Sequence, residues 1–221
     1  NELSKIDCDV IVAGLFEQQQ ELSGPAAELD NALGGIISQY VIEKDKFEAK
    51  FGQTYILQTY GKIAASKVLL VGLGKQEEVD IAKLRELGAK IAKKCDTALK
   101  AKIVCLTPYG KGLEGISLYD AVKTVVHGAL IGAYKFDRYL AEKTPSIEVF
   151  EIVENNNPQE AENGAKAGQI TGEAVNIARD LINEPASVVT PEYLAETALQ
   201  IEGLETKVMD EDEVGEMGMD A

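Results

Sequence analysis

The segment Lys67–Leu106 reads KVLLVGLGKQEEVDIAKLRELGAKIAKKCDTALKAKIVCL and predicts a strand, a helix and a second strand in succession. Its first part, Lys67–Leu73, is continuously apolar, as expected for a strand that is covered on both faces. From about Asp80 to Leu99 the apolar residues recur every three or four positions, which is the period of an amphipathic helix. Lys102–Leu106 is again apolar and strand-like. A unit of this kind favours an α/β fold.

The segments before residue 67 continue the alternation of strands and helices. Cys8–Leu15 (CDVIVAGL) is an apolar, β-rich run, and Pro25–Leu33 predicts a short helix that ends at the glycine pair after it. Val41–Phe47 and Thr54–Tyr60 flank a turn region around Gly52, so together they predict a β-hairpin.

After residue 106 the alternation is seen once more. Ser117 opens a capping-box-like start, and the apolar residues after it follow a helical spacing. Ile147–Val153 (IEVFEIV) alternates apolar and acidic residues, which is typical of a half-exposed or edge strand. Residues 1–155 are therefore predicted to form one domain, an α/β sandwich with a mostly parallel or mixed sheet.

A domain boundary is predicted at Asn155–Pro158, where three turn-forming residues precede a proline that suits the start of a helix. The helix from Pro158 to about Ile182 carries small residues on one face, at Ala161, Ala165, Gly168, Gly172, Val175 and Ala178. A glycine inside a helix costs roughly 1 kcal/mol relative to alanine, so this face is expected to approach a partner helix closely.

Residues 156–221 are predicted to be a linker helix and the beginning of a second domain. Thr190-Pro191 predicts the start of a further helix, with threonine as cap and proline in the first turn. Thr206–Met209 predicts a short strand, and the acidic run Asp210–Glu213 predicts another helix start. Consecutive carboxylates diverge on a regular backbone, so a metal site in that run is the weaker interpretation.

Composition narrows the classes of function. The chain has 45% hydrophobic and 27% charged residues, and no apolar run approaches the roughly 18–20 residues that span a bilayer. The net charge of −15 is concentrated after residue 155, where the sequence contains 3 basic and 15 acidic residues. This balance disfavours nucleic acid and anionic membranes as partners.

The three cysteines, at positions 8, 95 and 105, suit buried thiols in a reducing cytoplasm. The first residue is Asn1 rather than Met, so a shortened chain is expected.

Few residues are candidates for chemistry. His127 is the only histidine and lies in an apolar helical stripe, which favours a structural role. Gly72-Leu73-Gly74-Lys75 stands between a strand and a helix, where a phosphate cradle would lie, but the full spacing of such a motif is absent. A plain turn is therefore favoured there. A group of lysines is expected to form a solvated helix face rather than a nucleic-acid site: Lys90, Lys93, Lys94, Lys100 and Lys102.

One segment is similar to a known family. Ala178–Glu196 (ARDLINEPASVVTPEYLAE) closely resembles the segment that opens the catalytic domain of the leucyl aminopeptidase (cytosol aminopeptidase) family. Asn183 and Pro185 match its Asn-x-Pro signpost, and Thr190 and Pro191 match its Thr-Pro signpost. The resemblance is collinear along most of the chain, strongest over 165–221 and weakest before residue 60.

The resemblance implies a two-domain metallopeptidase. Its N-terminal domain, residues 1–155 here, would be a macro-domain-like three-layer sandwich with a mixed sheet. Its C-terminal domain would bind two divalent ions, commonly zinc or manganese, through a lysine and several Asp and Glu residues. The ions activate a water that attacks the first peptide bond, while a second lysine, an arginine and a bicarbonate assist. The implied substrates are peptides with a Leu-like N-terminal residue, and the implied assembly is a homo-hexamer in the cytoplasm.

The resemblance assigns no catalytic, cofactor-binding or metal-ligand residue within this chain. Nothing between Asn1 and Ala221 matches such a position, so the chain alone is expected to be inactive and to serve assembly or regulation. Lys166, Arg179 and Asp180 lie on the connecting helix and are expected to be packing or salt-bridge residues.

The alternative is a stand-alone macro-like module that binds ADP-ribose or another nucleotide. The fold class and the Gly72–Gly74 turn motivate it. Against it, Gly14-Leu15-Phe16-Glu17 follows the first strand, where a macro domain would have an Asn-rich loop.

Overall fold

The structure, a computed structural model, describes residues 2–18, 21–110, 113, 115–143 and 147–219. Its strands are β1 (Val10–Phe16), β2 (Thr54–Gln58), β3 (Lys67–Gly74), β4 (Ile103–Leu106) and β5 (Val149–Ile152). Its α-helices are α1 (Gly24–Leu33), α2 (Ile81–Lys93), α3 (Leu118–Ala133), α4 (Pro158–Asn183), α5 (Pro191–Leu199) and α6 (Glu211–Glu216). Short 3₁₀ turns are η1 (Leu3–Lys5) and η3 (Gln76–Glu78), and π-helical segments are η2 (Ile37–Ile42) and η4 (Lys94–Ala98).

The five strands form one mixed sheet in the order β2-β3-β1-β4-β5. β1 pairs in parallel with β3 and β4, and β4 pairs in parallel with β5, whereas β2 runs antiparallel to β3. The strands of the quoted unit therefore lie on either side of β1. β5 is at an edge, as its alternating sequence predicts.

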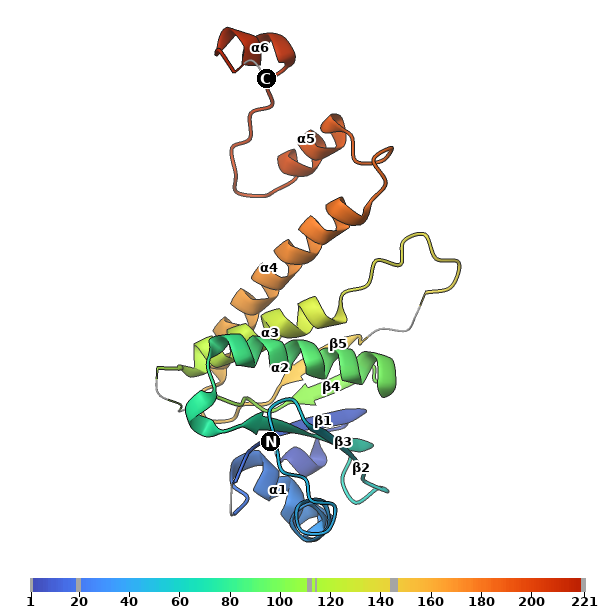
Figure 1. The fold of residues 1–221 in the computed structure, drawn as a ribbon, viewed down its shortest axis with the longest axis vertical. Coiled ribbons are helices and arrows are strands. Elements are labelled where there is room, and N and C mark those ends of the chain that lie inside the picture. Colours follow the sequence, from blue (N-terminus) through green and yellow to red (C-terminus); the bar gives the residue numbers. More distant parts are fainter. Residues whose placement is uncertain (1, 19–20, 111–112, 114, 144–146, 220–221) are drawn as a thin grey trace. The chain divides into compact units, whose positions relative to one another are not determined.

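Helices cover both faces of this sheet, so the predicted three-layer α/β sandwich is confirmed. Alternate residues of β1 enter different cores: Ile11, Ala13 and Leu15 face α1 and η2, whereas Val10 and Val12 face α2 and α3. In Figure 1, α1 lies on one side of the sheet and α2 and α3 lie on the other. Burial of both faces explains why the central strands are apolar throughout.

The predicted hairpin of Val41–Phe47 with Thr54–Tyr60 is wrong. Val41 lies near the end of η2, and the rest of the first segment follows this helical turn. The strand that pairs with β2 is β3. The buried Asp30 side chain explains the helical turn, because its Oδ1 accepts hydrogen bonds from the backbone N–H of Ile37 at 2.7 Å and of Ser38 at 3.1 Å. Such a side-chain acceptor stabilises the start of a helix.

The two helices predicted near the end of the chain are present as α5 and α6, whereas the predicted strand between them is not. Thr190 caps α5 through its hydroxyl, which accepts from the N–H of Tyr193 at 3.3 Å. The predicted strand Thr206–Met209 is wrong, because within the described residues no strand pairs with this segment and it has no regular structure.

Three helices approach one another through glycines. A Cβ on Gly128 of α3 would lie 2.1 Å from the carbonyl oxygen of Arg85 on α2. On α4, a Cβ on Gly168 would lie 2.4 Å from the carbonyl oxygen of Lys123 on α3. The small-residue face predicted for α4 therefore has a partner within this chain. Over the turns that contact α3, this face therefore needs no partner from another segment or subunit.

The chain divides into two compact units, Asn1–Asn176 and Ile177–Ala221. The first contains the sheet, its covering helices and most of α4. The second contains the end of α4 together with α5 and α6. The division falls within α4 because the earlier turns of this helix pack on α3. The domain boundary predicted between residues 155 and 156 stays a prediction.

Candidate functional site

The carboxyl ends of parallel strands are the usual place for a ligand in an open α/β sheet. Here this edge has a hollow of about 310 Å³, which Glu17 and Glu48 line, and one of about 410 Å³, which Glu17, Lys75 and Glu77 line. Three carboxylates against one ammonium make this edge unfavourable for a phosphate-bearing ligand.

The glycines at the end of β3 serve backbone packing. A Cβ on Gly72 would lie 2.1 Å from the carbonyl oxygen of Lys50, so only glycine fits there. The Gly72 N–H donates to the Gln53 carbonyl at 2.7 Å, and the Gly74 N–H donates to the Ala49 carbonyl at 3.1 Å. The amides that a phosphate cradle would use are therefore already engaged, which supports the plain-turn interpretation.

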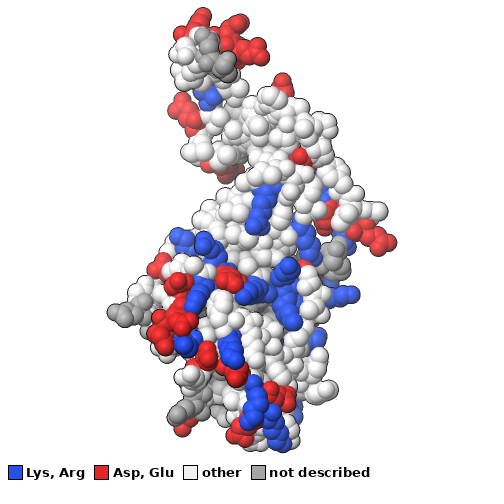
Figure 2. All heavy atoms as spheres, viewed as in Figure 1, with Lys and Arg blue, Asp and Glu red and all other residues white. Residues whose placement is uncertain are grey.

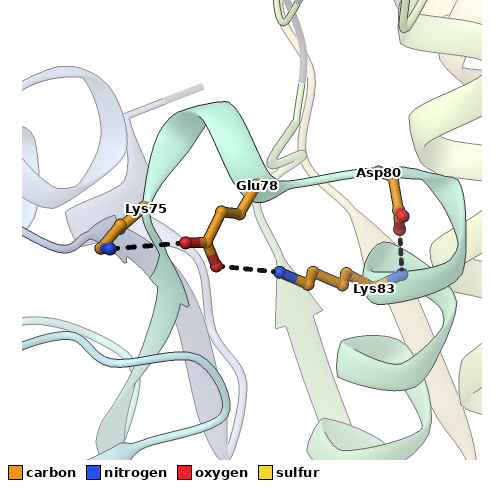
Figure 3. A network of polar contacts seen from close by, with 4 residues as sticks. All are labelled: Lys75, Glu78, Asp80 and Lys83. Atoms are coloured by element: carbon orange, nitrogen blue, oxygen red, sulfur yellow. Dashed lines mark hydrogen bonds and ion pairs between the residues drawn. The ribbon is translucent and has the colours of Figure 1, made fainter.

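A polar network continues from this turn to α2. Figure 3 shows Glu78 between two lysines, with its Oε1 3.4 Å from Lys75 Nζ and its Oε2 3.3 Å from Lys83 Nζ. The hydrogen bond from Lys83, followed by that from Lys75, lowers the pKa of the Glu78 carboxyl. Asp80 caps α2 by accepting from the Lys83 N–H at 2.7 Å. These groups satisfy one another and position the start of the helix.

The lysine group and the acidic run have structural explanations. Lys90 Nζ lies 2.7 Å from Glu86 Oε1, and Lys102 Nζ lies 2.8 Å from Glu148 Oε1. Figure 2 shows basic and acidic side chains intermixed over the α/β part of the chain, and acidic ones over α6. The acidic run forms a reciprocal capping box, in which Asp210 accepts from the Glu213 N–H at 2.9 Å. The helix-start interpretation of that run is therefore confirmed.

The connecting-helix residues Lys166, Arg179 and Asp180 all lie on α4. Lys166 Nζ lies 2.6 Å from Glu162 Oε1 on the same exposed face, as predicted for a salt-bridge residue. Arg179 and Asp180 lie near the end of α4, in the second compact unit. Across the described residues, no group of three or more His, Cys, Asp or Glu side chains is arranged to hold a metal ion.

The three cysteines are free and buried, as their apolar surroundings predict. Burial, followed by the nearby Asp96 charge, raises the pKa of the Cys95 thiol to about 12. The hydrogen bond with Cys8, followed by burial, raises the pKa of Cys105, and that same pairing lowers the pKa of Cys8. Because the thiolate is the reactive form, we expect Cys8 to react before the other two cysteines.

We therefore expect the folded chain to react slowly with the thiol reagent DTNB at pH 8. Burial slows all three thiols, and Cys8 reacts first because of its lowered pKa. Unfolding in guanidinium chloride should release three equivalents of thiol at once. The reaction is followed by absorbance, with Cys8→Ser as the control that removes the first phase. Rapid native labelling of Cys95 would contradict this prediction.

His127 has a more complex environment than its sequence indicates. Its Nδ1 lies 2.9 Å from Thr171 Oγ1 on α4, and burial followed by the charges of Arg85 and Lys123 lowers its pKa. A hollow of about 190 Å³ lies among these four residues, Ile81 and Thr124. No sequence motif joins these side chains, although the glycines on α3 and α4 indicate that helices approach one another closely here.

Comparisons with known proteins identify a family and individual relatives of this chain. A sequence model described as "Cytosol aminopeptidase family, N-terminal domain" matches residues 12–143. A protein of Alkaliphilus oremlandii, named probable cytosol aminopeptidase, is 32% identical over 227 residues, which are 99% of this chain and 45% of that protein. The chain thus spans about half the length of such relatives.

Solved structures share the fold. A mutant of tomato leucine aminopeptidase has a TM-score of 0.77 and 22% identity, covering 99% of this chain and 45% of the tomato chain. The bottromycin maturation enzyme BotP in complex with Mn has a TM-score of 0.65 and 21% identity, covering 87% of this chain and 35% of BotP.

No helix in the described part of this chain combines the length and hydrophobicity that crossing a bilayer requires.

Proposed function

This chain belongs to the cytosol aminopeptidase family, and from that premise we propose that it is the N-terminal part of a metal-dependent aminopeptidase that releases Leu-like residues from peptides. The observation that carries the proposal is the match of the N-terminal domain model over residues 12–143. Two divalent ions, manganese or zinc, would supply the hydrolytic chemistry. The family resemblance matches none of their ligands to a residue between Asn1 and Ala221, so we propose that the active site lies outside this chain.

The second compact unit supports a role in building a larger enzyme. Among its described residues only Glu184 is buried, and it exposes many large apolar side chains, such as Ile182 at 81% and Leu204 at 65%. A unit without a buried apolar core cannot offset the entropy of ordering its chain. We propose that the catalytic domain of the same protein covers these side chains.

The same premise carries the remaining proposals. A homo-hexamer is proposed from the family resemblance alone, since the glycine face of α4 already packs on α3 within the chain. A cytoplasmic location is proposed from the name of the relative and from the three free, buried cysteines. The Gly72–Gly74 turn does not support the alternative of nucleotide binding, because the N–H groups of Gly72 and Gly74 donate to backbone carbonyls.

Hydrolysis of leucine p-nitroanilide tests the proposed function. The complete product of the parent gene is expected to hydrolyse it when Mn²⁺ or Zn²⁺ is added and to lose the activity to a chelator. Residues 1–221 expressed alone are expected to show no hydrolysis under the same conditions. Light scattering on both proteins checks assembly.

Two outcomes would overturn the proposal. A complete gene product that stays inert with either metal would remove the aminopeptidase assignment. Metal-dependent hydrolysis by residues 1–221 would show instead that the active site lies within this chain.

A further inference from the structure

The hollow around His127 is lined by side chains of three helices. Ile81 and Arg85 come from α2, Lys123, Thr124 and His127 come from α3, and Thr171 comes from α4. Its volume is about 190 Å³, and the residues that line it include no carboxylate. In a chain with 37 acidic and 22 basic side chains, a hollow of this composition runs against the overall charge.

Glycine contacts fix the helices at this point. Gly128 lies against the carbonyl of Arg85, and Gly168 lies against the carbonyl of Lys123. The backbone of Arg85 is thus held where α2 meets α3, and the backbone of Lys123 where α3 meets α4. Side chains on packed helices are positioned more firmly than those on loops.

The charges in the hollow are not neutralised within the protein. In the described part of the chain, neither Arg85 nor Lys123 forms an ion pair, and the only ring near Lys123 Nζ is that of Tyr119, 5.7 Å away. Both cations oppose the protonation of His127, in addition to burial. An anion in the hollow would relieve this repulsion and would favour the imidazolium.

The hydrogen bonds around Thr171 assign the titrating nitrogen. Its hydroxyl donates toward the carbonyl of Ala167 at 3.0 Å or of Gly168 at 3.1 Å, which leaves its oxygen to accept from His127 Nδ1–H. The neutral imidazole therefore carries its proton on Nδ1. Proton uptake occurs at Nε2, which then becomes a donor.

We propose that this hollow binds a small dianionic oxyanion of the phosphate type. The Arg85 guanidinium and the Lys123 ammonium supply the fixed charge, and His127 Nε2–H adds a third donor when protonated. Binding is then coupled to proton uptake, so affinity rises as pH falls through the pKa of His127.

The single histidine makes the proposal directly measurable by NMR. Inorganic phosphate is titrated into the chain at constant ionic strength while the imidazole carbon and proton signals of His127 are recorded. We expect a saturable shift and a raised pKa of His127 in the presence of phosphate. Sulfate, whose charge stays constant over this pH range, should give the same result and separates the ionisation of the histidine from that of phosphate.

Variants distinguish a built site from general screening. Arg85→Gln and Lys123→Gln are each expected to weaken phosphate binding about tenfold, the effect of losing one charge-assisted hydrogen bond. Lys93→Gln removes the same charge from an exposed position of α2 and should leave the affinity unchanged. Circular dichroism verifies that each variant is folded. A shift that never saturates, or one that Lys93→Gln weakens as much as Arg85→Gln does, would overturn the proposal.

Discussion

Replacing Gly128 with alanine is expected to lower the free energy of unfolding by about 3 kcal/mol, near the upper end of the usual cost of overpacking. The added Cβ would lie 2.1 Å from the Arg85 carbonyl oxygen and 2.9 Å from its carbonyl carbon. These atoms belong to the backbone of α2, so they cannot rotate away as a side chain can. The helices must separate, and the buried residues between them lose contacts.

Urea unfolding followed by circular dichroism measures this loss, and the midpoint of thermal unfolding should fall by roughly 6–12 °C. Gly172→Ala is the matched control, because its Cβ would meet the side chain of Leu130 rather than a carbonyl. Alanine also gains about 1 kcal/mol of helix propensity over glycine, which offsets part of either cost. Equal destabilisation by the two substitutions would contradict the argument.

The glycine contacts also show what the sequence could and could not predict. The spacing of small residues on α4 predicts a close helix partner, and that partner exists. Its identity as α3 is a long-range property, because no local signal says which apolar or small face will meet another. The strands β1, β3 and β4 were predicted because burial on both faces leaves a direct record in each segment.

The failed predictions have the same origin. The hairpin prediction for Val41–Phe47 rests on the turn region around Gly52, which lies between this segment and Thr54–Tyr60. In the structure Ile37 and Val41 are buried one helical turn apart, and Asp30, seven residues before Ile37, holds the turn. The segment Thr206–Met209 has strand-like composition, but a strand also needs a neighbour with free backbone groups, and composition cannot supply one.

The hollow around His127 shows why a binding site is harder to predict from the sequence than a strand or a helix. His127 alone indicates a structural histidine, and that interpretation accounts for its contact with Thr171. The functional hypothesis depends on Arg85 and Lys123, which lie on different helices and have no shared motif. Only the packing of α2, α3 and α4 brings the three basic groups together.

A second large effect is expected at the buried ion pair of Asp96 and Lys135. Lys135 Nζ lies 2.6 Å from Asp96 Oδ2 and 2.8 Å from Oδ1, and the Asp96 side chain is only 3% exposed. Lys135→Met would leave that carboxylate buried without its cation. Breaking a buried pair from one side costs about 3–5 kcal/mol, because the remaining charge has lost both water and partner.

The double variant Asp96→Asn/Lys135→Met should recover much of this loss, since it removes both charges together. Lys166→Met provides the contrast: its pair with Glu162 is 2.6 Å long but exposed on α4, so its loss should change stability by no more than about 0.5 kcal/mol. Urea unfolding of the four proteins at pH 7, the wild type included, measures the difference. If Lys135→Met were as mild as Lys166→Met, water would have to reach Asp96 in the folded state. If the double variant were as unstable as Lys135→Met alone, the loss would arise from the other contacts of the lysine rather than from the stranded charge.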